Sequence, residues 1–152
     1  MSKWKEWEKK CEEHFFYFLE CGYIACNQAD EESALKLFKA ASLLKPDNTL
    51  CDVGFGYLHL HKLELAKACE MFEGVLRKEP ENEMAKTLLG ISKSMMPTGA
   101  AEGEKILHDM SNSSHDPYVK QLSDTAINFV DRFIKKSGGG PADVQKPKQP
   151  RK

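Results

Sequence analysis

The side chains of this 152-residue chain best suited to chemistry are five cysteines and five histidines. A metal site made of Cys21, Cys26 and His59 can be drawn, but thiolate sites for zinc usually show tightly paired cysteines, and the chain has no Cys-x-x-Cys pair. His59 and His61 lie two residues apart and would diverge on a helix. The sequence also has neither a nucleophile elbow nor a phosphate-binding loop. We therefore expect no catalytic residue, no metal and no cofactor, and we do not expect an enzyme.

The cysteines are expected to be reduced thiols packed in a core. Their number is odd and they fall among apolar positions, which is typical of structural cysteines in a reducing compartment. The five residues are Cys11, Cys21, Cys26, Cys51 and Cys69. The alternative interpretation, a thiol enzyme or redox sensor, requires an exposed cysteine with a lowered pKa.

Composition and charge are those of an ordinary soluble domain. Hydrophobic residues make up 41% of the chain, and the formal net charge of -1 lacks the basic excess of a nucleic-acid-binding protein. A membrane span needs about 20 consecutive apolar residues, and no apolar run in the chain approaches this length. The first residues are followed by charged residues rather than by the apolar core of a signal peptide. We expect a cytoplasmic protein with no membrane span and with no nucleic acid as partner.

The last fifteen residues differ from the rest in charge and composition. Four basic residues against one acidic residue give them a net charge of +3, which leaves -4 for the preceding chain. They contain almost nothing apolar that could offset the entropy of ordering. We expect a single domain over residues 1–137 and a disordered basic, Lys- and Pro-rich tail over 138–152. The charged residues of this tail are Lys146, Lys148, Arg151, Lys152 and Asp143.

Small residues, phenylalanines and prolines recur with a period of 34 residues. We interpret the small residues as places where two helices approach too closely for a larger side chain. Each phenylalanine then fills the gap beside such a contact, and each proline marks the end of a helix. The pattern predicts a helical hairpin as the repeating unit. The recurring residues are Gly22, Gly56 and Gly90, Ala34 and Ala68, Phe38 and Phe72, and Pro46 and Pro80.

The third copy of the repeat departs from this pattern. Glu102 and Ile106 stand where the first two copies have Ala and Phe. Residues 95–99 interrupt the helical pattern, because they contain Pro and Gly. We expect a short second helix over residues 100–110, ended by the Ser- and Asn-rich run at 111–114.

Flanking helices are expected at both ends of the repeats. An N-terminal helix should carry one apolar stripe and run into the first repeat, and a C-terminal helix over 116–137 should begin at an N-cap followed by Pro. Both helices are expected to cover the open ends of the stack. The N-terminal stripe is Trp4, Trp7, Cys11, Phe15 and Phe18, and the C-terminal stripe is Tyr118, Leu122, Ala126, Phe129 and Phe133.

The period and the recurring positions resemble the tetratricopeptide repeat (TPR). The first copy reads Phe18-x2-Cys21-Gly22-x2-Ala25, Ala34-x3-Phe38 and Pro46, and the second reads Asp52-x2-Phe55-Gly56-x2-His59, Ala68-x3-Phe72 and Pro80. The resemblance implies an all-α fold, namely a tetratricopeptide-repeat helical-hairpin solenoid. It would have about three repeats, near 15–48, 49–82 and 83–115, between the two flanking helices.

In the TPR family, the first helices of the repeats line a concave groove. The corresponding positions here are nearly all apolar, whereas relatives that grip acidic C-termini use Lys, Asn and Arg on this wall, so no carboxylate clamp is expected. An apolar groove with tyrosines at its rim suits an amphipathic helix or an extended apolar peptide. We expect Tyr57→Asp or Leu60→Lys to abolish binding and to leave the fold intact. The groove positions are Phe16, Leu19, Tyr23, Leu50, Val53, Tyr57, Leu60, Met84, Ile91 and Met95.

The order of elements resembles the tetratricopeptide-class chaperones of bacterial type III secretion systems. Residues 52–58 and 72–76, together with the helix over 122–134, resemble the needle-subunit branch most. The resemblance implies a bacterial cytoplasmic protein whose groove buries an amphipathic helix of a small secreted needle subunit and prevents premature polymerisation. A second small co-chaperone could dock on the N-terminal stripe.

Three alternatives stay open at this point. The client could be a translocator protein of the same secretion system, or the chain could be a general TPR scaffold for protein-protein interaction. The groove could also be filled by a flanking helix of this chain or by a second copy in a homodimer, in which case its residues are core.

Overall fold

The computed structural model describes residues 2–136, and in this range it contains helices and no strand. The all-α prediction is confirmed, while the predicted tail over 138–152 lies outside the described residues. In chain order the elements are α1 (Lys3–Asn27), α2 (Glu31–Leu44), α3 (Thr49–His61), α4 (Leu65–Lys78), α5 (Glu83–Ser94), α6 (Ala100–Ser113), α7 (Pro117–Phe129) and the π-helical turn η1 (Val130–Ile134).

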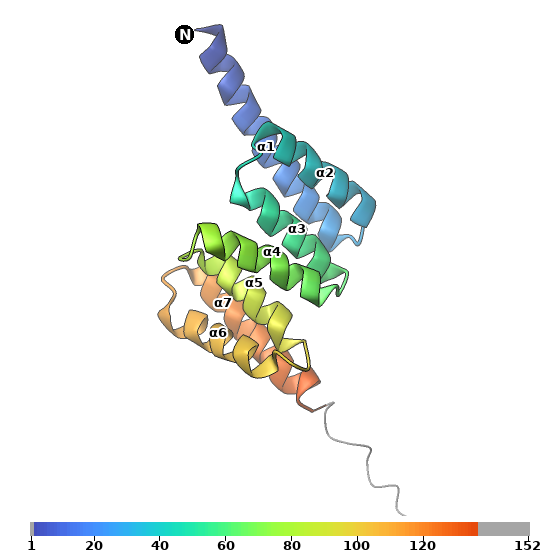
Figure 1. Cartoon of the computed structure of the whole chain (residues 1–152), viewed down its shortest axis with the longest axis vertical. Helices are drawn as coiled ribbons and strands as arrows, with labels where there is room; N and C mark the ends of the chain where they lie inside the picture. The colour runs from blue at the N-terminus through green and yellow to red at the C-terminus, as the bar shows by residue number, and fades with distance from the viewer. Residues whose placement is uncertain (1, 137–152) are drawn as a thin grey trace, which may run out of the picture.

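Consecutive helices pair into hairpins that stack along one axis (Figure 1). The pairs are α1 with α2, α3 with α4, and α5 with α6, and α7 lies against α5 and α6. The helices α3, α5 and α7 begin at N-caps spaced by 34 residues, Asn48, Asn82 and Asp116, whose side chains accept hydrogen bonds from the first turn. Helix α7 therefore occupies the place of the first helix of a fourth hairpin.

The first two hairpins are closed by matching tight turns. Three residues link the helices in each, and the middle ones, Ala29 and Leu63, adopt left-handed backbone conformations with φ of 59° and 57°. In both turns the next N–H donates to the carbonyl five residues earlier, as in a Schellman motif. The sequence period is thus set by the turns as well as by the helices.

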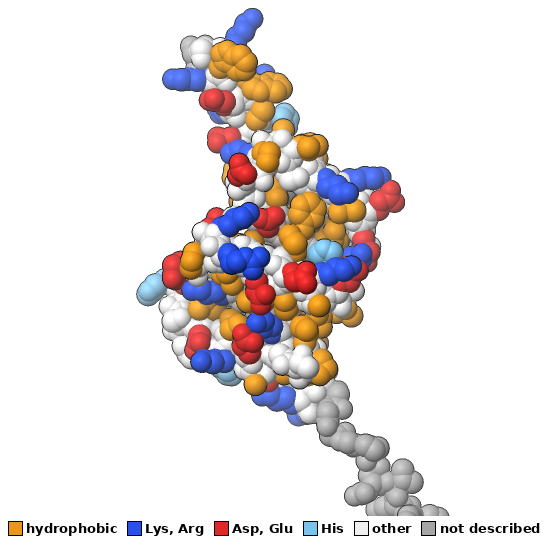
Figure 2. Space-filling view, viewed as in Figure 1, with side chains coloured by type: hydrophobic (Ala, Val, Ile, Leu, Met, Phe, Trp, Pro, Cys, Tyr) orange, Lys and Arg blue, Asp and Glu red, His pale blue; other side chains and the backbone are white. Residues whose placement is uncertain are grey.

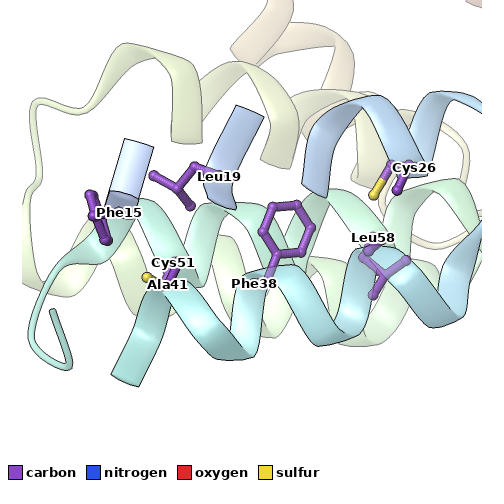
Figure 3. Packing of buried hydrophobic residues seen from close by; sticks show 9 residues of the cluster. Phe15, Leu19, Cys26, Phe38, Ala41, Cys51 and Leu58 are labelled. Atoms are coloured by element: carbon purple, nitrogen blue, oxygen red, sulfur yellow. The ribbon is translucent and has the colours of Figure 1, made fainter. Parts of the chain in front are cut away.

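Phenylalanine rings of the second helices lie on glycines of the first helices. Phe38 lies against Gly22 and Gly54, and a Cβ atom on Gly56 would come within 2.6 Å of the ring of Phe72. Both phenylalanines are fully buried. Figure 3 shows Phe38 at the centre of the first core cluster. The interpretation of the glycines as sites of close helix approach is confirmed.

The third hairpin repeats this close packing, but residues next to the repeat positions take part in it. A Cβ atom on Gly103, next to Glu102, would lie 2.6 Å from the carbonyl oxygen of Gly90, and a Cβ atom on Gly90 would lie 3.1 Å from both Ile106 and Leu107. The linker over 95–99 has five residues where the other hairpins have three. This longer linker begins one residue earlier and ends one residue later than the period gives, and α6 runs on to Ser113.

Two adjoining clusters of buried side chains form the core. One lies among α1, α2 and α3, and the other runs from α3 to α5 with contributions from α6 and α7. Cys26 and Cys51 belong to the first cluster and Cys69 to the second. Cys11 is half-buried and Cys21 is exposed, which corrects the expectation that all five cysteines are packed in a core.

The N-terminal helix was predicted to cover the end of the stack, and in the structure it does not. It runs into the first hairpin as one continuous helix, α1, but its first eight residues are all exposed and project beyond the hairpins (Figure 1). Trp4 is 76% exposed and Trp7 is 61% exposed. The chain bends back only after Asn27, and among the described residues the segment meets only the end of α2, where Leu44 and Lys45 line an open hollow together with Trp7.

Helix α7 packs with a different face from the predicted one. Its buried residues are Val119, Ser123 and Ala126, followed by Val130, whereas Tyr118, Phe129 and Phe133 are exposed. The helix lies beside α5 and on α6, so its core side points to these two helices rather than across the end of the stack. Asp124 follows its N-cap by eight residues, as Gly56 and Gly90 follow theirs, and it is exposed. It accepts a hydrogen bond from the Ser111 hydroxyl.

Within residues 2–136, no helix has both the length and the apolar character that crossing a membrane requires.

Candidate protein-binding face

Helices α1, α3, α5 and α7 lie side by side and form one surface, which we call the inner face. Because α3, α5 and α7 start 34 residues apart, and α1 ends 34 residues before α3 ends, equivalent side chains form rows across the four helices. The first row is Phe16, Leu50, Met84 and Tyr118, the middle row is Tyr23, Tyr57, Ile91 and Thr125, and the last row is Asn27, His61, Met95 and Phe129.

The first row is apolar and open to solvent. Phe16 is 51% exposed, Leu50 is 39% exposed and Tyr118 is 78% exposed, while Met84 is half-buried. Met84 packs in part against the second core cluster, whereas Phe16, Leu50 and Tyr118 stay exposed among the described residues. A row of this kind over four helices exceeds the scattered apolar residues of an ordinary surface.

The middle and last rows are joined by ring contacts at the α1–α3 end. The rings of Tyr23 and Tyr57 meet edge to face with centroids 5.2 Å apart, and the ring of His61 lies 4.5 Å from that of Tyr57. The Tyr57 hydroxyl donates a hydrogen bond to Oδ1 of Asn27 at 2.9 Å. Burial raises the pKa of both tyrosines, so their hydroxyls stay neutral at physiological pH.

At the other end, α5 and α7 enclose an apolar hollow of about 300 Å³, which we call the α5–α7 hollow. A second hollow of about 360 Å³ adjoins it around Met84, Tyr118 and Leu122. Leu122 and Phe129 were not predicted as residues of this face, because α7 was expected to be a cap. The spacing of 34 between the predicted groove residue Met95 and Phe129 is the signal that could have found Phe129, whereas Leu88, the equivalent of Leu122, is buried in the second core cluster. The α5–α7 hollow is lined by Ile91, Ser94, Met95, Leu122, Thr125, Ala126, Phe129 and Val130.

The structure divides the ten predicted groove residues into surface and core. Phe16 and Leu50 are exposed, and Tyr23, Tyr57, Met84, Ile91 and Met95 are half-buried on the inner face. The other three are core residues, which corrects their assignment to the groove: Leu19 belongs to the first cluster, and Val53 and Leu60 belong to the second. They point inward because a helix that packs on both sides buries most of its circumference.

Charged side chains pair mainly away from the inner face. Nδ1 of His59 lies 2.6 Å from Oε2 of Glu64 at the α3–α4 turn, and Lys78 pairs with Asp52 between α4 and α3. The hydrogen bond from His59, followed by that from Lys67, lowers the pKa of Glu64. Figure 2 shows positive and negative side chains interspersed over the hairpins, and apolar side chains next to charged ones at the projecting end of the chain.

The side chains considered above for a metal site or for thiol chemistry do not form such a site in the described part of the chain. Among residues 2–136, no three side chains of the His, Cys, Asp and Glu type come together in a metal-binding arrangement, and Cys21, Cys26 and His59 are no exception. Burial raises the pKa of the Cys26 thiol to about 11 and also raises the pKa of Cys51 and Cys69. Thiols of this kind are poor nucleophiles at neutral pH.

The inner face thus offers apolar surface together with neutral hydroxyl and amide groups. A surface with these properties can bury the apolar side chains of another protein segment and hydrogen-bond to its polar edge. Comparisons of the chain with protein-family models, with curated proteins and with solved structures find no match.

Proposed function

We propose that this protein is a TPR-type chaperone of a bacterial type III secretion system that acts in the cytoplasm. Its client is an amphipathic helix of a small secreted subunit, the needle protein, held on the inner face. The 34-residue period, the N-caps in matching positions and the two equal turns support the TPR assignment.

The observation that carries the proposal is the open first row of the inner face. An apolar row that spans four helices is unfavourable in water unless something binds it, and nothing in the described chain does so. The row therefore suits a segment that alternates between this surface and another apolar environment. A subunit that polymerises through its own amphipathic helix has such a segment.

The inner face favours a helical client over an extended one. A peptide that binds by strand addition needs a sheet edge, and the described residues contain no strand, so this way of holding an extended client is not offered. A client helix satisfies its own backbone hydrogen bonds and needs only side-chain contacts, which the three rows supply. Tyr23 and Tyr57 add hydroxyl groups that can pair with polar residues at the edge of that helix.

The mechanism that follows is sequestration by competition. The same apolar face of the client helix cannot contact a neighbouring subunit and the chaperone at once, so binding lowers the concentration of free helix available for assembly. Release then requires a competing partner or a change in the client, since the inner face has no nucleotide-binding loop to drive it.

The test is co-expression of the chain with the small helical secreted subunits encoded in the same genome, followed by size-exclusion chromatography with light scattering. We expect one stoichiometric complex with a needle subunit. Phe16→Glu/Leu50→Glu should abolish it, because two charges are placed on exposed apolar positions of the inner face. Leu43→Glu is the matched control, since Leu43 is 82% exposed on α2.

Three results would contradict the proposal. One is the absence of a complex with any such subunit. The second is a complex whose stability is unaffected by Phe16→Glu/Leu50→Glu. The third is a stable complex with a translocator protein in place of a needle subunit. Circular dichroism and thermal melting of each variant establish that loss of binding is not loss of fold.

A further inference from the structure

Two apolar features of the molecule are accessible from solvent. One is the pair Trp4 and Trp7 on the projecting start of α1, which we call the tryptophan stripe. The other is the α5–α7 hollow. The start of α1 extends a continuous helix and so needs no nucleation of its own, but apart from an open hollow beside Leu44 and Lys45 it gains little packing. We therefore expect the tryptophan stripe to bind another surface.

The α5–α7 hollow matches the stripe in shape and chemistry. Its volume of about 300 Å³ is at the small end of ligand pockets, which suits one or two large side chains rather than a cofactor. Met95 and Phe129 line it, and thioether and aromatic groups both make favourable contacts with an indole ring. The hollow is concave and the stripe is convex, so the stripe gains more burial there than against another free helix.

The two features cannot meet within one molecule. They lie at opposite ends of the hairpin stack (Figure 1). Helix α1 is continuous over 25 residues, a length of about 37 Å, and has no break at which its start could fold back. Residues 137–152 are no better as an occupant, since Val144 is their one aliphatic residue larger than Ala or Pro.

We propose that the tryptophan stripe of one copy of this chain docks into the α5–α7 hollow of a second copy. The contact joins two different surfaces, so it is head to tail, and it leaves one free stripe and one free hollow at the ends of each assembly. This proposal does not depend on the identity of the client, and it describes the protein before any client is bound.

The size of the contact predicts a weak and reversible association. Aromatic side chains bury about 150–250 Å² of surface each. The total surface buried by two tryptophans and by the walls of the hollow is therefore smaller than that of a stable interface, which is about 1,200 Å² or more. Assembly should therefore depend on protein concentration. A client helix that covers the hollow displaces the neighbouring copy.

The experiment uses the fluorescence of Trp4 and Trp7, which are the two tryptophans of the chain. We expect the emission maximum of the wild-type protein to move to shorter wavelength as its concentration rises, in parallel with its mass by sedimentation velocity. Trp4→Glu/Trp7→Glu and Thr125→Glu/Phe129→Glu should each stay monomeric. Both variants introduce negative charge, so the altered stripe and the altered hollow repel each other.

Mixing the two variants is the decisive step. Trp4→Glu/Trp7→Glu keeps an intact hollow and has no tryptophan, while Thr125→Glu/Phe129→Glu keeps the stripe. The mixture should form a dimer that cannot grow further, with blue-shifted emission. Its dissociation constant should lie within about tenfold of the wild-type value, a difference of about 1.4 kcal/mol.

Three outcomes would overturn the proposal. The first is a wild-type protein that stays monomeric, with an emission maximum independent of concentration; the stripe would then serve a different protein. The second is a variant mixture that does not associate, as expected if stripes pair with stripes. The third is self-association that survives in Trp4→Glu/Trp7→Glu alone. The variants alter exposed or surface-lining residues, and melting curves verify that they fold.

Discussion

The ring of Phe38 lies directly on the backbone of Gly22, and a Cβ atom on this glycine would come within 2.5 Å of Cε1 of the ring. The ring is fully buried and has Gly54 on another side, so it has no space into which to move. The distance between α1 and α2 is therefore set by the absence of a side chain at one position.

We expect Gly22→Ala to destabilise the protein. The gain of about 1 kcal/mol in helix propensity is outweighed by an overpacking cost of up to about 3 kcal/mol, which leaves a net loss of about 1–2 kcal/mol. Urea denaturation measures it. Gly74→Ala is the control, because the nearest atom to its added Cβ lies 3.6 Å away on Arg77, and it should gain about 0.5–1 kcal/mol. Equal effects of the two substitutions would show that the close contact does not matter.

Leu63→Gly should stabilise the turn between α3 and α4. Leu63 is 71% exposed and has a φ of 57°, a conformation that costs a residue with a Cβ atom about 1–2 kcal/mol. The greater freedom of glycine in the unfolded chain offsets part of this gain, so the net increase in the free energy of unfolding is about 0.5–1 kcal/mol. Thermal denaturation measures it, with Leu43→Gly in α2 as a control that should lower stability. A lower melting temperature for Leu63→Gly would contradict the expectation.

Leu60→Lys should unfold or strongly destabilise the protein, although from the sequence alone we expect it to leave the fold intact. Leu60 is 9% exposed and packs in the second core cluster, so truncating its packing alone costs about 2–5 kcal/mol. A buried ammonium group adds a desolvation cost. Leu50→Glu should change stability by no more than about 0.5 kcal/mol, since Leu50 is exposed. Thermal melting of the two variants compares their stabilities. Similar melting curves would contradict the assignment of Leu60 to the core.

The free energy of unfolding should fall as the pH rises from 9 to 11. Burial raises the pKa of Cys26 from 9.0 to about 11 in the folded state, with a smaller effect of Glu31. In this window the unfolded chain loses the thiol proton first, so deprotonation favours unfolding. Urea midpoints measured across the window should fall less steeply for Cys26→Ala than for the wild type. Identical slopes would mean that Cys26 does not contribute.

Much of the hairpin architecture could be predicted from the spacing of small residues and rings. Gly22 and Gly56, with Phe38 and Phe72 sixteen residues later, predict two hairpins because the same steric constraint recurs at the same place. The third unit departs from the pattern for a local reason. The linker between α5 and α6 lacks the left-handed turn of the first two, and it begins one residue earlier and ends one residue later than the period gives, so that Gly103 and Leu107 also enter the contact with Gly90.

The inner face could be predicted by type but not residue by residue. The rows of Phe16 and Tyr57 follow from the period, whereas Leu19 and Leu60 lie at the edges of the apolar arc, where a small rotation of the helix decides between surface and core. The role of helix α7 was even harder to predict. An apolar stripe on a terminal helix does not show whether it covers the stack or continues it, and the cap at Asp116 was the better guide.

Asp124 sets a chemical limit on the length of the stack. It stands where Gly56 and Gly90 receive the second helices of their hairpins. A helix packed on α7 in the same way would have to bury a carboxylate beneath its side chains, at a cost of several kcal/mol unless a cation came with it. Within the described residues, helix α7 is therefore a half-unit, and its exposed surface belongs to the same wall as the rows of the inner face.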